Sequence, residues 1–181
     1  MNSKLWDKSI LMVDDEPDIL TLLEEEIHEA CPNCRVIKAE TYERAVDLLN
    51  STPYDLVILD IMGVRGFDLL TLAVRLNHPV VMLTAHALSP ETLKKTIEQG
   101  ARAYLPKEEI GRIVPFLEDV LTHDPISGWR RPFELLGEYF SRYFGPDWQH
   151  ADERFWKDFN EKLKTDGISY VETPSQKLGF Y

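Results

Sequence analysis

Leu56-Val57-Ile58-Leu59-Asp60 places four consecutive apolar residues directly before one carboxylate. Such a run, bounded by Pro53 and Gly63, is typical of a strand that is buried on both faces of a parallel sheet. The carboxylate at its end has left the core but is still held rigidly by the strand. Ligands of open α/β sheets bind just beyond the carboxyl ends of the strands. We therefore expect Asp60 to lie in a binding site.

Three further apolar runs end on polar residues in the same way. Because the carboxyl ends of parallel strands lie at one edge of a sheet, these polar side chains should come together. The sequence therefore predicts one site with three acids, a hydroxyl group and a lysine. Residues 10–13 lead into Asp14 and Asp15, residues 80–83 lead into Thr84, and residues 103–105 lead through Pro106 into Lys107.

Strand-like and helix-like patterns alternate five times along the first two thirds of the chain. A short additional strand is expected at residues 35–39, and the segments between strands have the apolar spacing of amphipathic helices. This order predicts an α/β fold, a doubly wound five-stranded parallel sheet with helices on both faces. We expect this domain to span residues 7–123, with Pro115 delaying or kinking its last helix.

Residues 124–181 form a second, aromatic-rich segment that contains three of the four tryptophans. Large apolar residues recur at three- and four-residue spacings on both sides of Gly145-Pro146, which predicts an α-helical hairpin over residues 129–163. We expect an irregular tail from Ile168 onward. The aromatic stripe needs cover, which is provided by the chain's own first domain, by a second copy in a homodimer, or by a partner protein that docks there.

The composition narrows the class of protein. The formal net charge is -11 over 181 residues, and 44% of them are hydrophobic. The hydrophobic content suits a globular core, whereas the negative charge disfavours nucleic acid, which binds basic faces. No apolar run approaches the roughly 20 residues that span a bilayer, and the N-terminus has no apolar signal stretch. We expect a cytoplasmic protein whose partners are neither nucleic acid nor membrane.

The two cysteines, Cys31 and Cys34, form a single CxxC. That motif by itself suits a redox pair or half of a metal site. No second pair in the sequence completes a metal site, so we expect two reduced thiols in a loop at the end of a helix.

The acids at the predicted sheet edge indicate magnesium-dependent phosphoryl chemistry. Three carboxylates in one pocket repel each other unless a cation lies among them, and oxygen ligands without a cysteine or histidine cage favour Mg²⁺. One carboxylate can then attack a phosphoryl group in line, which depends mainly on positioning and on neutralising oxygen charge. Thr84 would supply a hydroxyl donor and Lys107 an ammonium group.

This combination resembles the receiver domain of two-component response regulators, a CheY-like domain with a flavodoxin-like fold. The resemblance covers residues 7–123 and implies that Asp60 accepts a phosphoryl group from a sensor histidine kinase or a phosphotransfer protein. It rests on Leu11-Met12-Val13-Asp14-Asp15-Glu16-Pro17, Val57-Ile58-Leu59-Asp60-Ile61-Met62, Val81-Met82-Leu83-Thr84-Ala85 and Ala103-Tyr104-Leu105-Pro106-Lys107.

The resemblance also implies a role for each neighbour of Asp60. Asp15, Asp60 and the backbone carbonyl of Met62 would bind Mg²⁺ directly, and Asp14 would act through water. Thr84 and Lys107 would contact the phosphoryl group as hydrogen-bond donor and cation. Thr84 would also form the conformational switch with Tyr104, its hydroxyl moving inward and the ring following.

The sequence departs from the family pattern around this site. The loop Gly63-Val64-Arg65-Gly66 is shorter than usual, and its added Arg65 is a candidate modulator of the phosphoryl group or a contact for a partner. Lys107 is followed by Glu108 where the family has a cis proline, so either a strained cis bond or a trans bond presents the lysine.

Met62 and His86 occupy the two positions that, in the family, flank the line of water attack on the phosphorylated aspartate. An apolar Met62 should hinder an incoming water, whereas the imidazole of His86 could orient one. His86 is therefore a second candidate modulator, of the phosphoryl lifetime.

The sequence favours a response regulator that relays a signal by conformational change and protein contacts. It would be a phosphoacceptor that catalyses only its own phosphoryl uptake and loss, rather than an enzyme with a separate substrate. Two alternatives stay open: a phosphorylation-independent interaction module on the same fold, and a transcription regulator with an unrecognised output segment.

Overall fold

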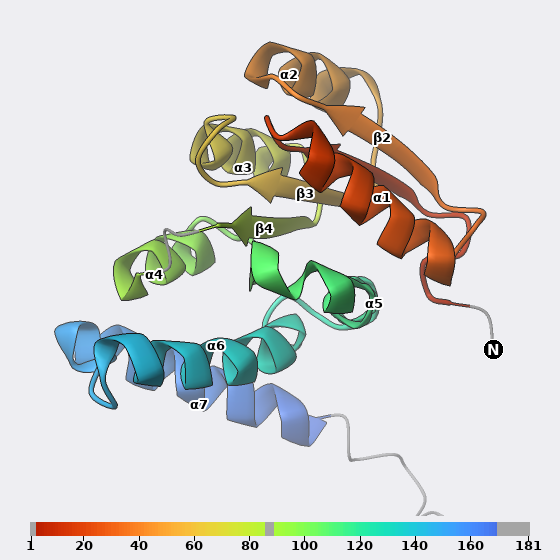
Figure 1. Ribbon diagram of the computed structural model, residues 1–181. Helices are drawn as coiled ribbons and strands as arrows, with labels where there is room; N and C mark the ends of the chain where they lie inside the picture. The colour runs from red at the N-terminus through yellow and green to blue at the C-terminus, as the bar shows by residue number, and fades with distance from the viewer. Residues whose placement is uncertain (1–2, 86–88, 170–181) are drawn as a thin grey trace, which may run out of the picture.

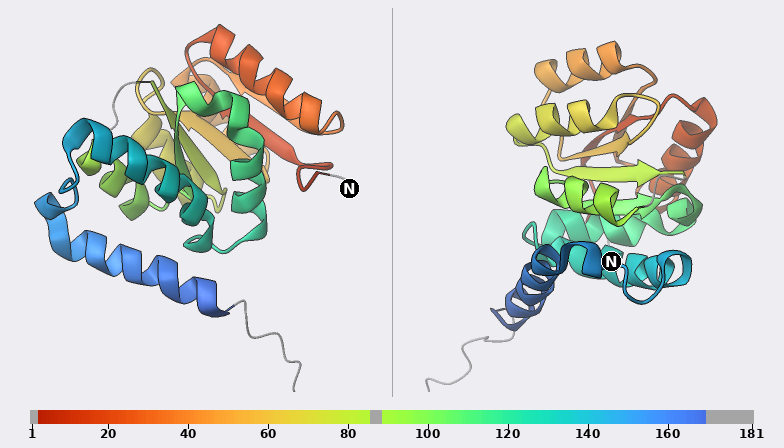
Figure 2. Two further views of the ribbon diagram at one scale, coloured as in Figure 1. Left: turned by 60° about the horizontal axis from the view of Figure 1, so that its bottom comes forward. Right: turned by 90° about the vertical axis from the view of Figure 1, so that its left-hand side faces the viewer.

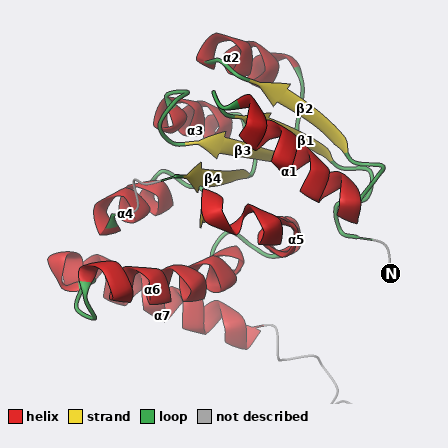
Figure 3. Cartoon of the chain, in the orientation of Figure 1, coloured by secondary structure: helices red, strands yellow, loops and turns green. Residues whose placement is uncertain are grey.

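The strands of the chain form one parallel sheet in the order β2-β1-β3-β4-β5, with β3 in the middle (Figure 1, Figure 3). The computed structural model describes residues 3–85 and 89–169. The doubly wound five-stranded fold expected from the sequence is confirmed. The strands are β1 (Ser9–Val13), β2 (Arg35–Ala39), β3 (Leu56–Asp60), β4 (Val80–Thr84) and β5 (Ala103–Pro106).

Helices alternate with the strands and then continue beyond the sheet. Local sequence sets several of their starts: the Ser89 hydroxyl caps α4 by accepting a hydrogen bond from the Thr92 amide at 3.1 Å. Residues 107–112 form a 3₁₀ helix before α5, so the late start expected from Pro115 is confirmed. The helices are α1 (Pro17–Ala30), α2 (Tyr42–Ser51), α3 (Gly66–Arg75), α4 (Pro90–Glu98), α5 (Ile113–Thr122), α6 (Arg130–Phe144) and α7 (Glu153–Ser169), with 3₁₀ helices η1 (Lys107–Arg112), η2 (Ser127–Trp129) and η3 (His150–Asp152).

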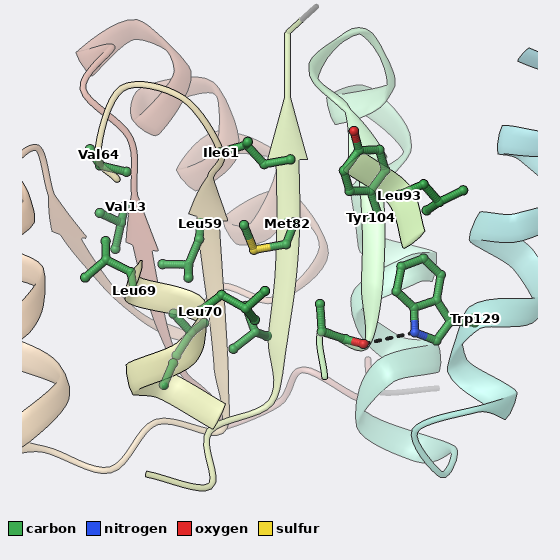
Figure 4. Packing of buried hydrophobic residues seen from close by; sticks show 14 of the residues in the cluster. Val13, Leu59, Ile61, Val64, Leu69, Leu70, Met82, Leu93, Tyr104 and Trp129 are labelled. Carbon is green, nitrogen blue, oxygen red and sulfur yellow. Dashed lines mark hydrogen bonds between the residues drawn. The ribbon is translucent and has the colours of Figure 1, made fainter. Parts of the chain in front are cut away.

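The sheet has a hydrophobic core on each face, because successive strand residues point to opposite sides. In β3, Ile58 packs with α1 and α5 on one face. Val57 and Leu59 pack with α2, α3 and α4 on the other face, which Figure 4 shows from close by. All five residues of β3 are buried, as the uninterrupted apolar run predicts.

The C-terminal helices α6 and α7 lie beside the β5 edge of the sheet, beyond α4 and α5 (Figure 2). Trp129 joins them to the sheet: it is buried, and its Nε1 donates a hydrogen bond of 2.9 Å to the carbonyl oxygen of Ala101 (Figure 4). Arg130 ties the two helices together by donating to the carbonyl oxygen of Leu163 at 3.0 Å. The aromatic stripe of the hairpin therefore packs on the chain's own sheet. α7 continues to Ser169, past the tail start expected at Ile168.

Cys31 and Cys34 are free, buried thiols just after α1. The Cys34 thiol donates to the carbonyl oxygen of Leu5 at 2.8 Å, and burial raises its pKa to about 12. Cys34 is therefore a thiol, not a thiolate, at neutral pH. Among the residues that the structure describes, none of the helices has the length and apolar character needed to cross a bilayer.

Candidate functional site

The register of the strands brings the predicted site residues to one edge of the sheet. Leu59 pairs with Val13, Asp60 with Leu83, and Thr84 with Pro106. Asp14, Asp60, Thr84 and Lys107 therefore all emerge at the carboxyl ends of four adjacent strands, β1, β3, β4 and β5. Local apolar runs fix these positions, since each polar residue is the first one after a buried strand segment.

Three carboxylates face one another at this edge. Ligand oxygens of Asp14, Asp15 and Asp60 all lie within 4.8 Å of one another. Asp14 and Asp60 are buried, with exposed fractions of 1% and 3%, whereas Asp15 is exposed. A set of hard oxygen donors with one open side fits a divalent cation such as Mg²⁺, which keeps several of its waters.

Lys107 supplies the positive charge that the structure shows among these acids. Its side chain is 8% exposed, and its Nζ lies 2.8 Å from Asp14 Oδ2, 2.8 Å from Glu16 Oε1 and 3.2 Å from Asp60 Oδ1. Burial lowers the pKa of Lys107, but the surrounding carboxylates outweigh it and raise that pKa above its ordinary value. Lys107 is therefore an ammonium group at neutral pH.

Glu16 is a site residue that the sequence analysis missed. Its carboxylate accepts a hydrogen bond from Lys107, and this bond lowers the pKa of Glu16. The one signal in the sequence was its place directly after Asp14-Asp15. Periodicity cannot tell whether such an acid turns toward the site or toward water.

The surroundings of Asp14 disfavour its charged form, whereas those of Glu16 favour it. Burial raises the pKa of Asp14 and the charge of Asp60 raises it further, while Lys107 and the backbone amide of Glu16 act in the opposite direction. The net pKa of Asp14 is raised because removing a carboxylate from water disfavours its charged form.

Asp60 is fixed by the backbone of the loop that follows it. Its Oδ2 accepts hydrogen bonds from the amides of Met62 at 3.2 Å and Gly63 at 2.9 Å, while Oδ1 faces Lys107. Two amides and an ammonium group orient the carboxylate through hydrogen bonds to Oδ2 and an ion pair at Oδ1. This arrangement suits a nucleophile that must be held in line with an incoming group.

Thr84 and Tyr104 lie on neighbouring strands and are both completely buried. Burial raises the pKa of the Tyr104 hydroxyl, and a hydrogen bond with the Thr84 side chain opposes this shift. The ring of Tyr104 packs beside Leu93 and Trp129, with its hydroxyl toward the carboxyl edge of the sheet (Figure 4). The two residues expected to form the switch therefore interact directly.

Comparisons with known proteins agree with this geometry. The family model described as the response regulator receiver domain matches residues 10–115. The chain belongs to this family. It is 36% identical over 104 residues to the two-component response regulator ARR18 of Arabidopsis thaliana. This match covers 54% of this chain and 16% of that protein. It is 37% identical over 81 residues to the response regulator GtcR of Aneurinibacillus migulanus. This second match covers 43% of this chain and 33% of that protein.

The chain thus spans a third or less of the length of these two curated relatives. Among solved structures, a putative response regulator from Chloroflexus aurantiacus J-10-fl matches with a TM-score of 0.55 and 26% identity, covering 64% of this chain and 98% of that one. Receiver domains bind Mg²⁺ at an acidic pocket of this kind, and the acids required are in place here.

The departures of this receiver from the family pattern now have a structural description. No cis peptide bond occurs within residues 3–85 and 89–169, so a trans bond joins Lys107 to Glu108. The lysine still reaches Asp60. In the shortened loop, a Cβ atom at Gly66 would lie 2.1 Å from the carbonyl oxygen of Asp60, so only glycine allows this close approach.

The candidate modulators differ in where the structure places them. Met62 is 69% exposed and lies at the pocket that Asp15, Asp60 and Lys107 line. The guanidinium of Arg65 lies 4.1 Å from the centre of the Tyr42 ring and pairs with Asp68 at 2.7 Å, so its contacts are with α2 and α3. His86 lies outside the described residues.

Gly63 makes room for Asp15, which gives a direct test of the acidic pocket. A Cβ atom at position 63 would lie 1.8 Å from Asp15 Oδ1. Gly63→Ala should push the exposed Asp15 side chain away at little cost in stability, and weaken Mg²⁺ binding by about tenfold or more. Calorimetric titration with Mg²⁺ measures this, with Gly137→Ala on α6 as the control, because nothing lies within 4 Å of that Cβ. Unchanged affinity would show that Asp15 is not a ligand.

Proposed function

We propose that this receiver is a Mg²⁺-dependent phosphoacceptor switch that is phosphorylated on Asp60 by a histidine kinase or a phosphotransfer protein. The observation that supports this most strongly is the convergence of Asp14, Asp15 and Lys107 on the buried carboxylate of Asp60. A carboxylate that is oriented by backbone amides beside a lysine is prepared to receive an anionic group. A solvated turn acid has none of these contacts.

The chemistry assigned to Asp60 is an in-line transfer. One carboxylate oxygen of Asp60 attacks the phosphorus atom of a phosphohistidine, the new O–P bond forms, the N–P bond breaks, and the imidazole leaves with its electron pair. Such transfers depend on positioning and on neutralising the phosphoryl oxygens. Mg²⁺ held by Asp15, Asp60 and the carbonyl of Met62, with Asp14 acting through water, would supply part of that neutralisation.

Lys107 and Thr84 provide the remaining contacts to the phosphoryl group. Lys107 already lies 3.2 Å from Asp60 Oδ1, so its ammonium pairs with the transferred group with only a small movement. The hydroxyl of Thr84, one strand away, donates to a phosphoryl oxygen. In this proposal the chain catalyses only its own phosphoryl uptake and hydrolysis, and no DNA-binding segment takes part, which suits a net charge of -11.

Intact-mass spectrometry of the 181-residue chain, after incubation with a small phosphodonor and Mg²⁺, tests the proposal. We expect a single, labile phosphoryl adduct that is absent in Asp60→Asn and absent when a chelator replaces Mg²⁺. Asp68→Asn is the matched control, because Asp68 is an exposed acid near the same loop whose partner is Arg65. It should take up the phosphoryl group as the unaltered chain does. No adduct with any donor would indicate a receiver fold that works by binding alone.

A further inference from the structure

The C-terminal helices share one buried cluster with Tyr104. Leu136 and Phe140 on α6 are completely buried and belong to the same hydrophobic core as Tyr104 and Leu93. Helix α6 contacts β5, the strand that contains Tyr104. The position of this ring is therefore part of the surface on which α6 rests.

Tyr139 extends this contact to the carboxyl edge of the sheet. It lies between Leu136 and Phe140 in sequence and packs against the same cluster. Burial raises the pKa of both Tyr104 and Tyr139, and Tyr139 lies close enough to Tyr104 to add to the rise of the Tyr104 pKa. The charge of Glu108 adds to the rise of the Tyr139 pKa. Its ring lies 4.4 Å from that of Tyr143, one turn further along α6. Helix α6 thus covers Tyr104 up to the edge where the phosphoryl group would lie.

A second connection joins α4 to the start of α7. Lys94 pairs with Asp152, and its Nζ lies 5.1 Å from the centre of the Phe155 ring. The next residue, Lys95, points elsewhere: its Nζ lies 3.9 Å from the centre of the Phe67 ring on α3. Of these two adjacent lysines, Lys94 contacts the hairpin and Lys95 contacts another helix of the receiver. Substituting each in turn can therefore show what the contact with the hairpin contributes.

The hydrogen bonds of Thr84 set the direction of coupling between Asp60 and this cluster. The anionic oxygens of a phosphoryl group are stronger acceptors than a carboxylate that is already paired with Lys107. When Thr84 donates to the phosphoryl group, its oxygen is left to accept a hydrogen bond from the Tyr104 hydroxyl. Chains of hydrogen bonds polarise one another and strengthen each bond. Phosphorylation of Asp60, as proposed above, would therefore stabilise the buried position of Tyr104 and, with it, the packing of α6.

We infer that α6 and α7 are the output element of this switch, an internal partner that docks more firmly on α4 and β5 when Asp60 carries a phosphoryl group. The inference rests on the proposed phosphoacceptor function. Coupling of this kind is reciprocal, so docking of the helices also raises the fraction of chains that are phosphorylated at a given donor concentration.

Hydrogen exchange of the full chain, with and without phosphodonor and Mg²⁺, tests this inference. The phosphorylated fraction is measured by intact mass in the same samples. We expect phosphorylation to slow exchange of the α6 and α7 amides by about fivefold or more, the lower end of typical coupling. Lys94→Gln should speed this exchange in both states by a few-fold and lower the phosphorylated fraction. Lys95→Gln, the matched control, should change neither quantity.

Tyr104→Phe separates the hydrogen-bond chain from the packing, because it keeps the buried ring and removes the hydroxyl. In this variant the helices should stay docked and Asp60 should still be phosphorylated, but the slowing of exchange should disappear. A full adduct with unchanged or faster exchange in α6 and α7 would overturn the output role and leave the phosphoacceptor function standing. No adduct in the unaltered chain would overturn both.

Discussion

Trp129→Ala should lower the free energy of unfolding by about 4 kcal/mol, the largest stability loss that we expect from a single substitution in the C-terminal segment. Trp129 is 1% exposed, and the centre of its ring lies 6.1 Å from the centre of the Phe159 ring. Its Nε1 donates a hydrogen bond to the carbonyl oxygen of Ala101 across the boundary between hairpin and sheet. The alanine removes a large apolar side chain and leaves a buried carbonyl without its partner.

Urea unfolding followed by circular dichroism measures this loss without relying on the fluorescence of the deleted indole. Trp6→Ala is the matched control, because Trp6 is 44% exposed and its loss should change stability by only about 0.5 kcal/mol. Trp129→Phe should fall between the two, since it keeps most of the packing and loses the hydrogen bond. If Trp129→Ala were as stable as Trp6→Ala, the hairpin would not be anchored to the sheet through this residue.

The sheet and its site could be predicted because their signals are local. Each strand is an uninterrupted apolar run, and a polar residue at its end is at the sheet edge whatever else the chain does. On that basis the sequence predicts that Asp14, Asp60, Thr84 and Lys107 lie together, as the strand register shows them to do. The trans bond before Glu108 agrees with the cost of a cis bond before a residue other than proline, about 2.5–4 kcal/mol. The sequence could not show that Lys107 still reaches Asp60 from a trans bond.

What the sequence did not predict depends on contacts between distant residues. The spacing of aromatic residues in α6 showed that the helix has a buried face, but not that β5 is its partner. The bond from Trp129 to Ala101 joins residues 28 positions apart, and no periodic pattern encodes it. The orientation of the Glu16 side chain toward Lys107 is likewise a choice of rotamer. It depends on the ammonium group of Lys107, which lies 91 positions later in the chain.

Lys107→Met should lower the free energy of unfolding by about 3 kcal/mol at pH 7 in the presence of a chelator. The substitution keeps an apolar side chain of similar length and removes the ammonium group, which leaves Asp14 and Asp60 buried beside each other without a nearby cation. Lys38→Met is the matched control, because Lys38 pairs with Glu24 at the surface. Its substitution should lower the free energy of unfolding by only about 0.5 kcal/mol.

Asp14→Asn should act in the opposite direction and stabilise the protein at neutral pH. The raised pKa of Asp14 means that the folded state holds its proton at pH values where the unfolded carboxyl, with its ordinary pKa of 3.8, has lost it. The folded state thus binds more protons there, and stability falls as the pH rises from about 4 through the folded pKa. The asparagine has no such proton to lose, so this part of the fall should be missing from urea unfolding measured between pH 4 and 8.

The double variant Lys107→Met/Asp14→Asn decides whether charge or packing explains the loss in Lys107→Met. If an unpaired buried carboxylate is the cause, replacing Asp14 by a neutral amide removes much of the penalty, and the double variant should be clearly more stable than Lys107→Met alone. The two substitutions are then strongly non-additive, as expected for groups in direct contact. If the double variant is as unstable as Lys107→Met, the unpaired carboxylate of Asp14 is not the cause, and the loss comes from Asp60 or from the packing of the methionine side chain.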